Sequence, residues 1–224
     1  MDPIPDNLDH DLDDNPRYRV LHDFRSRFLP GARNISIYLP EAYRIEPHRR
    51  FPVFYLHDGQ NLFDPRTSYL PGHTWRAHTT ADRLTAAGLI EPLILVGVAN
   101  TALGGSSLGG LISLALGLAH PETFGKLAVI SPSIWWNGRS ILTLLDQAHP
   151  NPRPRIWLDM GMAEGLRHLR DADLLHRRLL QRGWRDSPTP NADLHYLRVP
   201  GGLHTEDAWA ERFGEVLRFL FPAR

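Results

Sequence analysis

The chain has 224 residues, no cysteine and a formal net charge of zero at pH 7. This length suits one large α/β domain or two small ones. The absence of cysteine excludes disulfides, thiol catalysis and cysteine metal sites. The balanced charge argues against nucleic-acid binding, because no basic stripe is available to pair with a phosphate backbone. No apolar run reaches the roughly 18 residues that a membrane span needs.

The first 16 residues are acidic, and they lack the basic-then-apolar order of a signal peptide. We therefore expect a flexible acidic tail at residues 1–16, followed by a single domain at residues 17–224. We also expect a cytoplasmic location.

Two segments at the start of the domain, 17–29 and 33–43, alternate apolar and polar residues, which predicts two antiparallel, half-buried strands. After them, apolar strands alternate with helical segments. We expect strands within 51–56, 91–100, 126–133, 155–165 and 192–204, and helices at 75–89, 108–119, 139–149, 167–183 and 207–221. This alternation predicts a mostly parallel sheet with helices on both faces. The continuous apolar run 51–56 predicts a strand that is covered on both faces.

A serine lies between glycines in the segment GGSSLGG, which fits G-x-S-x-G with Gly105, Ser107 and Gly109. In this pattern the serine is a nucleophile on a strained strand-to-helix turn, where small neighbours let the helix pack against the strand. The amide of Leu108 is then the first donor to a developing oxyanion. The pattern by itself is weak, because glycine-serine turns also serve as ordinary helix caps.

The order of the other polar residues strengthens the case for catalysis. His204 follows the last expected strand, at the sheet edge where Ser107 should lie, although it could also be an ordinary surface histidine. It would act as the general base. Two acids follow or end the strand at 155–160. Glu164, in the loop, is the candidate that would orient the histidine, whereas Asp159, within the strand, suits a structural hydrogen-bonding role better.

The loop after the strand 51–56 should supply the second oxyanion donor. Gly59 allows close backbone approach, so the amide of Gly59 or Gln60 is the expected donor. His57 and Asp58 do not predict a metal site, because adjacent side chains on an extended chain point in opposite directions.

Three residues at the same edge of the sheet are candidates for substrate binding: Asp58, Trp135 and Trp136. The two tryptophans could form a wall of an acyl or sugar pocket. Ordinary packing explains them equally well.

Five motifs in this order resemble the putative esterase family of α/β-hydrolases: FPVFYLHDGQNLFD, GGSSLGGLISL, SPSIWW, LDMGMAEG and PGGLHTEDAWAERF. The family includes esterase D-like enzymes, enterochelin esterases, feruloyl and acetylxylan esterases and mycolyltransferases. The resemblance covers roughly residues 17–222. It implies an α/β-hydrolase fold, Ser107 as nucleophile, His204 as base, an acid at Glu164 and no cofactor. It does not name the substrate.

The connection between the strand 93–100 and the serine turn is too short for this fold. Two parallel strands need a crossover of at least about ten to twelve residues, and only Thr101–Leu103 remain here. Three extended residues reach about 10 Å, less than the roughly 17–20 Å of one strand. Three explanations are open. Residues between Asn100 and Thr101 exist in the molecule but are absent from this sequence, the gene carries an internal deletion, or the strand 93–100 runs directly into the turn.

The leading hypothesis is a serine carboxylesterase that hydrolyses a small ester through an acyl-enzyme. One alternative is a catalytically impaired binding protein of the same fold, in which the missing crossover has displaced the serine. Another is an acyltransferase that passes the acyl group to an acceptor other than water. The expected partner is a small-molecule ester, without nucleic acid or membrane.

Overall fold

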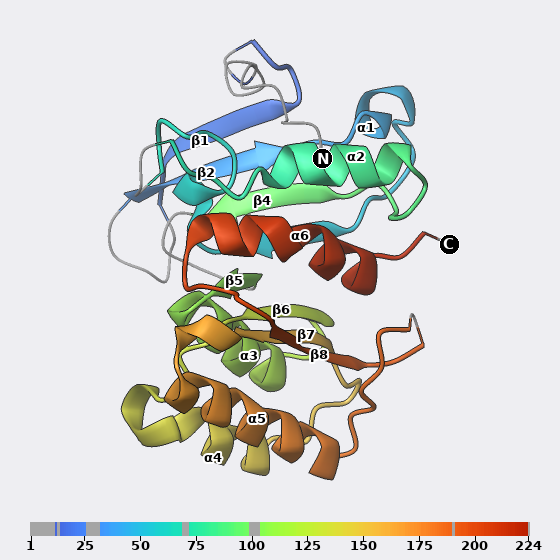
Figure 1. Ribbon diagram of the computed structural model, residues 1–224. Coiled ribbons are helices and arrows are strands. Elements are labelled where there is room, and N and C mark those ends of the chain that lie inside the picture. The colour runs from blue at the N-terminus through green and yellow to red at the C-terminus, as the bar shows by residue number, and fades with distance from the viewer. Residues whose placement is uncertain are drawn as a thin grey trace.

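A computed structural model of the chain is shown in Figure 1. The structure describes residues 12, 14–25, 32–68, 72–98, 104–189 and 191–223. One sheet has the strand order β1-β2-β4-β3 and the other has the order β5-β6-β7-β8. The strands are β1 (Tyr18–Arg25), β2 (Ala32–Tyr38), β3 (Val53–Leu56), β4 (Ile94–Val98), β5 (Gly104–Ser106), β6 (Lys126–Ile130), β7 (Arg155–Gly161) and β8 (Leu194–Val199).

The two sheets adjoin at β3 and β5, where the amide of His57 donates to the carbonyl of Gly104 at 2.7 Å. Strand β1 pairs antiparallel with β2, and β2 pairs antiparallel with β4. The β3–β4 pair and all pairs from β5 to β8 are parallel. The expected antiparallel start and mostly parallel sheet are therefore confirmed.

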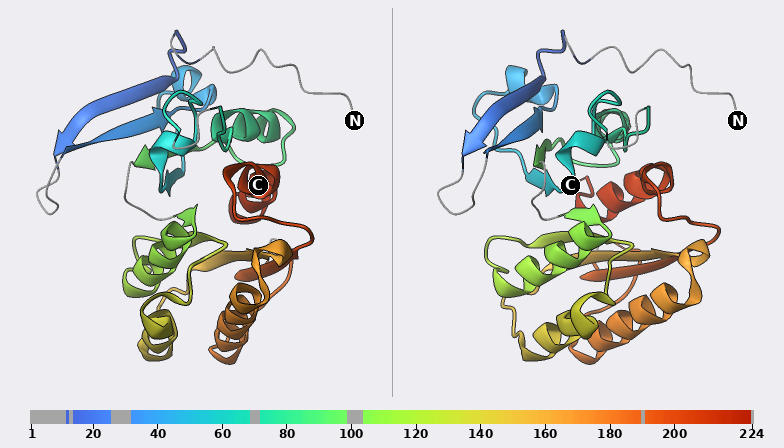
Figure 2. Two further views of the ribbon diagram at one scale, coloured as in Figure 1. Left: turned by 60° about the vertical axis from the view of Figure 1, so that its left-hand side comes forward. Right: turned by 90° about the vertical axis from the view of Figure 1, so that its left-hand side faces the viewer.

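Helices cover the second sheet on both faces (Figures 1 and 2). The helices are α1 (Ala42–Ile45), α2 (Ala77–Ala86), α3 (Leu108–Ala119), α4 (Ser140–Gln147), α5 (Leu166–Gln181) and α6 (Glu206–Leu220). Short 3-10 helices are η1 (Gly59–Asn61), η2 (Trp136–Arg139) and η3 (Met162–Glu164). Helix α6 contacts α2 on one side and β6 and β7 on the other.

The alternating side chains of β6 divide the apolar interior into two clusters. Ala128 and Ile130 belong to a cluster with residues of α2 and α6. Leu127 and Val129 point the other way and belong to a cluster with residues of α3, α4 and α5. This follows from the period of two along a strand, which sends successive side chains to opposite faces.

The prediction that strand 51–56 is covered on both faces is wrong. Phe54 and Leu56 of β3 are buried in the cluster with α2 and α6, but Val53 and Tyr55 are 42% and 44% exposed. A continuous apolar run indicates that a strand is buried, but it does not show whether a helix covers one face or both. Within the described residues, no helix packs over Val53 and Tyr55.

Strand β4 ends at Val98 and β5 begins at Gly104, and residues 99–103 lie outside the described residues. The short connection inferred from the sequence falls on these residues. Because β5 is a strand of its own and β3 lies between it and β4, the explanation in which the strand 93–100 runs directly into the serine turn is wrong.

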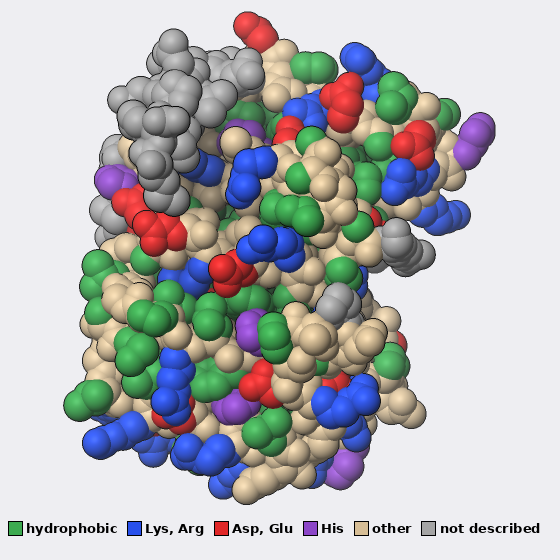
Figure 3. Space-filling view, turned by 45° about the vertical axis from the view of Figure 1, so that its right-hand side comes forward, with side chains coloured by type: hydrophobic (Ala, Val, Ile, Leu, Met, Phe, Trp, Pro, Cys, Tyr) green, Lys and Arg blue, Asp and Glu red, His purple; other side chains and the backbone are tan. Residues whose placement is uncertain are grey.

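Leu12 lies within the predicted tail but is buried against the core. Residues 14–16 of the predicted tail are exposed or half-buried, and residues 1–11 and 13 fall outside the described residues. Among the residues that are described, no helix is both long and apolar enough to cross a membrane. On the face drawn in Figure 3, positive and negative side chains are interspersed, in keeping with the zero net charge.

Candidate active site

Ser107 stands on a strained turn between β5 and α3, with φ 58° and ψ −122°. A positive φ is unfavourable for a residue with a Cβ, and such strain gathers at functional sites. Backbone hydrogen bonds hold the turn: the amide of Ser107 donates to the carbonyl of Ile130 at 3.0 Å, and the amide of Leu111 donates to the carbonyl of Ser107 at 3.2 Å. The backbone therefore has the form that a nucleophile turn requires.

The two flanking glycines are required because His57 packs against them. A Cβ on Gly105 would lie 2.9 Å from the Cβ of His57, and one on Gly109 would lie 3.2 Å from it. His57 itself is buried, and its Nε2 has no hydrogen-bond partner among the described residues. Burial lowers the pKa of His57 to about 4, so the imidazole is neutral at pH 7. This histidine is therefore a packing residue of the turn.

His204 and Glu164 come together as expected. Nδ1 of His204 lies 2.7 Å from Oε2 of Glu164. Glu164 belongs to η3, directly after β7, and His204 lies in the loop between β8 and α6. The Glu164 side chain is 3% exposed, whereas that of His204 is 45% exposed. The histidine is thus anchored on its inner nitrogen and open to solvent on its outer side.

The Glu164 carboxylate is held in its ionised form. Burial alone would raise its pKa, but hydrogen bonds from His204, Ser131 and the amide of Gly161 outweigh burial and bring the pKa below its ordinary value. An ionised carboxylate on Nδ1 keeps the imidazole in the tautomer that leaves Nε2 as a proton acceptor.

Asp159, the other acid considered from the sequence, is bound to residues other than His204. Its side chain is fully buried and accepts hydrogen bonds from Trp157 Nε1 at 2.7 Å and Arg212 Nη2 at 3.1 Å. It makes no contact with His204 among the described residues.

Ser107 and His204 are not hydrogen-bonded to each other in the described part of the chain. Instead, Oγ of Ser107 lies 3.1 Å from Oγ of Ser133. The amide of Ser133 also donates to the carbonyl of Ser107 at 3.0 Å. The sequence reasoning missed Ser133, although its position just after β6 places it at the edge of the sheet where Ser107 lies.

The proposed oxyanion donors lie on two elements. Within the described residues, the amides of Gly59, Gln60 and Leu108 donate to no backbone oxygen. Gly59 is also needed for packing, because a Cβ there would lie 2.5 Å from the carbonyl carbon of Gly97 in β4. Asp58, which precedes η1, has φ 53°, so the chain is not extended there as the sequence reasoning assumed.

Trp135 and Trp136 are 42% and 48% exposed, so they are not ordinary core residues. The amide of Trp136 donates to the carbonyl of Ser133 at 3.0 Å, which ties this pair to the serine that contacts Ser107. A cavity of about 540 Å³ lies beside His204 and is lined by Val199–Leu203, Thr205–Ala208, His73 and Glu211.

The pKa of Asp58 is raised above its ordinary value. Burial of the carboxyl group is the main cause, and the negative charge of nearby Glu206 adds to it.

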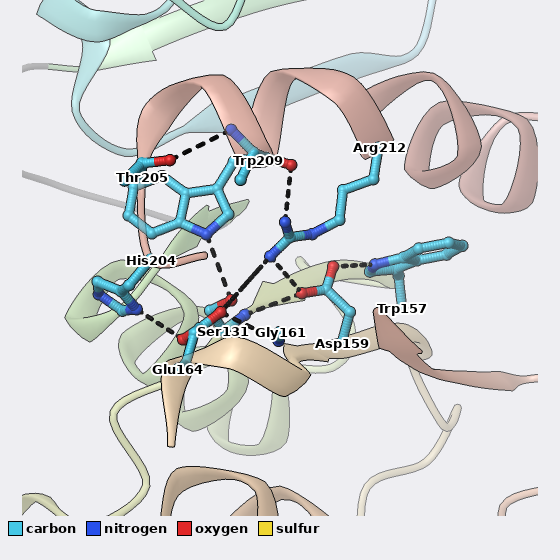
Figure 4. Close-up of polar contacts among 10 residues, drawn as sticks. Ser131, Trp157, Asp159, Gly161, Glu164, His204, Thr205, Trp209 and Arg212 are labelled. Atoms are coloured by element: carbon cyan, nitrogen blue, oxygen red, sulfur yellow. Dashed lines mark hydrogen bonds and ion pairs between the residues drawn. The ribbon is translucent and has the colours of Figure 1, made fainter. Parts of the chain in front are cut away.

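The sequence reasoning also missed Ser131, Trp209 and Arg212, which surround Glu164 (Figure 4). A signal for Arg212 was present in the sequence. Trp209, Phe213 and Val216 define the buried face of α6 with helical spacing, and Arg212 falls on that face.

A family model described as putative esterase matches residues 26–101 and 97–220. The chain belongs to the putative esterase family. It is therefore a hydrolase that acts on esters. The two matched segments of the esterase family meet at residues 97–101, where the connection before β5 is short.

Two curated proteins and one solved structure illustrate what this esterase is similar to. An uncharacterized protein of Bacillus subtilis, YbbA, is 23% identical over 245 residues, covering 88% of this chain and 95% of YbbA. A siderophore enterobactin esterase of Emericella nidulans is 37% identical over 92 residues, 33% of this chain and 30% of that protein. The structure of a ferulic acid esterase has a TM-score of 0.69 at 15% identity and covers 92% and 98% of the two chains. At this identity the structure supports the α/β-hydrolase fold alone.

Proposed function

We propose that the chain is a serine carboxylesterase with Ser107 as nucleophile, His204 as general base and Glu164 as the acid that orients His204. The observation that carries the proposal is the 2.7 Å contact between Glu164 and His204, which leaves the second imidazole nitrogen free, together with the strained turn at Ser107. Family membership supports the reaction class.

In the first half-reaction, Nε2 of His204 takes the proton from Ser107 Oγ while Oγ forms a bond to the ester carbonyl carbon. The carbonyl oxygen becomes an oxyanion, which the amides of Leu108 and Gln60 would stabilise by donating hydrogen bonds. Collapse of this intermediate breaks the bond to the alcohol oxygen, and His204 returns the proton to the leaving alcohol. Water then repeats the same steps on the acyl-enzyme and releases the acid.

Ser107 Oγ must leave Ser133 for this reaction. Rotation about χ1 between staggered positions moves Oγ without any change in the backbone. Catalytic hydrogen bonds are often unformed in the free enzyme and tighten when substrate binds. The contact with Ser133 is therefore compatible with catalysis and describes the resting position of the hydroxyl.

The substrate that fits best is a small ester with an apolar or aromatic acyl group. Large exposed apolar side chains lie close in sequence to the site residues: Trp135, Trp136, Met162, Leu166 and Leu203. Two proteins similar to this chain are named for siderophore enterobactin and ferulic acid esters. Three acidic residues, Glu206, Asp207 and Glu211, line the cavity beside His204, so an anionic leaving group would be repelled there.

The test is hydrolysis of p-nitrophenyl acetate and methyl ferulate by the purified full chain. We expect Ser107→Ala and His204→Gln to abolish hydrolysis, and Ser106→Ala, the neighbouring serine, to retain it. Glu164→Gln should reduce kcat by about 100-fold or more, because it leaves the imidazole without its charged partner. Undiminished hydrolysis by Ser107→Ala would remove the assignment.

A further inference from the structure

Arg212 is a buried cation on the otherwise apolar face of α6, with a side chain only 5% exposed. Its Nη2 atom lies between two buried carboxylates, 3.1 Å from Oδ1 of Asp159 and 3.9 Å from Oε1 of Glu164 (Figure 4). Taking an arginine and a carboxylate out of water is costly, and such a pair often gives no more stability than apolar residues would. Its place beside Glu164 therefore points to a role in the site.

Ser131 connects this ion pair to Glu164. Its Oγ accepts hydrogen bonds from Arg212 Nη2 at 2.8 Å and from Trp209 Nε1 at 3.3 Å. Guanidinium and indole nitrogens can only donate, so both acceptor positions of the hydroxyl are occupied. The hydroxyl hydrogen must then point at Oε1 of Glu164, which lies 2.5 Å away. Arg212 and Trp209 thus fix the direction in which Ser131 donates.

The Glu164 carboxylate is held on one oxygen and left open on the other. Oε1 accepts from Ser131 Oγ and from the amide of Gly161 at 3.0 Å. Oε2 is the atom that meets His204. Because Oε1 is fixed by two donors, the orientation of the carboxylate is set before His204 contributes its own hydrogen bond. The backbone supports this arrangement at some cost, since Ser131 has φ 41°.

Asp159 is the closer ion-pair partner of Arg212. It accepts from Arg212, from Trp157 Nε1 and from the amide of Ser131 at 3.1 Å. The closer carboxylate is Asp159, so the guanidinium charge is compensated without drawing Glu164 away from His204. The interactions drawn in Figure 4 form one continuous network from Trp157 to His204.

We propose that the Arg212–Asp159 pair positions the catalytic acid, acting through the directed hydroxyl of Ser131 to hold Glu164 in the orientation that His204 requires. This inference rests on the proposed function, since it assigns the roles of Glu164 and His204 given there. Arg212, Asp159 and Ser131 touch no substrate and are positioning residues.

The test is the double variant Arg212→Met/Asp159→Asn, which removes both charges of the ion pair together, so that neither of them is left buried without its partner. The hydrogen-bonded Nδ1 proton of His204 gives a low-field proton NMR signal, assigned by its absence in His204→Gln. We expect this signal to move or disappear in the double variant. We also expect kcat for p-nitrophenyl acetate to fall by about 10- to 100-fold, as a displaced catalytic group does, with KM changed less than about threefold. Arg212→Lys, which keeps the charge, should recover part of kcat.

The matched control is Arg178→Met/Asp146→Asn, which removes an exposed ion pair between α5 and α4. It should change neither the signal nor kcat. An unchanged signal and kcat in a folded Arg212→Met/Asp159→Asn protein would overturn the proposal. If that protein does not fold, the same two measurements on Ser131→Ala test the proposal. This variant removes the hydroxyl that connects Arg212 to Glu164 and keeps the Arg212–Asp159 ion pair. Should the wild-type protein hydrolyse no ester while the signal still depends on Arg212, the positioning role stands and the proposed function fails.

Discussion

The hydroxyl oxygens of Ser107 and Ser133 lie 3.1 Å apart, so the resting position of the proposed nucleophile faces a second serine and not His204. Ser133 is buried, and its amide donates a hydrogen bond to the carbonyl of Ser107. The side-chain contact can therefore be removed while the backbone contact stays. This separates the effect of the second hydroxyl from the shape of the turn.

We expect Ser133→Ala to make Ser107 more reactive. A neutral hydrogen bond contributes about 0.5–1.5 kcal/mol, so its loss should speed labelling by a fluorophosphonate probe by roughly 2- to 10-fold. The measurement is the pseudo-first-order labelling rate, with Ser187→Ala, a half-buried serine whose hydroxyl bonds to Thr189, as control. Slower labelling would instead mean that the Ser133 hydroxyl assists the reaction at Ser107.

The neutral, buried His57 should make folding stability depend on pH. Its pKa in the folded protein, about 4, lies below the ordinary histidine value of 6.5, so the unfolded chain binds more protons between these values. The contribution is complete above pH 6.5 and is lost as the pH falls through this window. Between pH 7 and pH 5 the free energy of unfolding should drop by about 2 kcal/mol from this residue.

Urea denaturation at pH 7, 6 and 5 measures this effect. His57→Gln should lower stability at pH 7 and flatten the dependence on pH, because glutamine does not titrate. His149→Gln, a matched change at an exposed histidine, should leave the dependence as it is. The measured range, pH 5 to 7, lies above the range in which Glu164 titrates: the pKa of that residue is lowered on folding, so its contribution is lost only at more acidic pH. Equal slopes for wild type and His57→Gln would contradict the prediction.

Gly105→Ala should destabilise the protein by about 1–3 kcal/mol, because the added methyl group would meet His57 at 2.9 Å in a packed region. Gly125→Ala is the matched control, since a Cβ there meets nothing within 4 Å. It should be neutral or stabilising by up to about 1 kcal/mol. Thermal and urea unfolding provide the comparison. The double variant His57→Ala/Gly105→Ala should lose less than the sum of the single changes, as contacting residues do.

Local pattern was enough to predict the order of strands and helices, the family and the pairing of His204 with Glu164. The reason is that parallel strands bring their carboxyl ends to one edge, so chain order alone places the histidine and the acid together. The order of elements along the chain does not determine which rotamer a side chain adopts. The contact of Ser107 with Ser133 could therefore not be predicted.

The Arg212–Asp159 pair beside Glu164 could not be predicted from the sequence for a different reason. Arg212 has the residue type of an exposed helix position, and only its spacing from Trp209 and Phe213 indicates burial. Its partner Asp159 lies 53 residues away along the chain. A contact between such distant residues depends on how α6 packs against β7, which periodicity does not specify.

The exposed face of β3 is linked to the short connection between β4 and β5. Helix α2 connects β3 to β4 and lies on the side of Phe54 and Leu56. The next strand in the chain, β5, adjoins β3 on the side away from β4. Because crossovers between parallel strands are right-handed, a normal connection from β4 to β5 would lie on the other face, over Val53 and Tyr55. These two side chains therefore mark where a crossover helix would pack.

We expect Tyr55→Ser to change the free energy of unfolding by less than about 1 kcal/mol, because the side chain is 44% exposed and surface changes are usually mild. Phe54→Ala, on the covered face of the same strand, should cost about 3–5 kcal/mol. The intact mass of the same sample should be compared with 25.5 kDa, the mass of this sequence. A heavier chain in which Tyr55→Ser is as costly as Phe54→Ala would show that a crossover exists and covers this face. At 25.5 kDa, a similarly large cost would contradict the exposure of Tyr55.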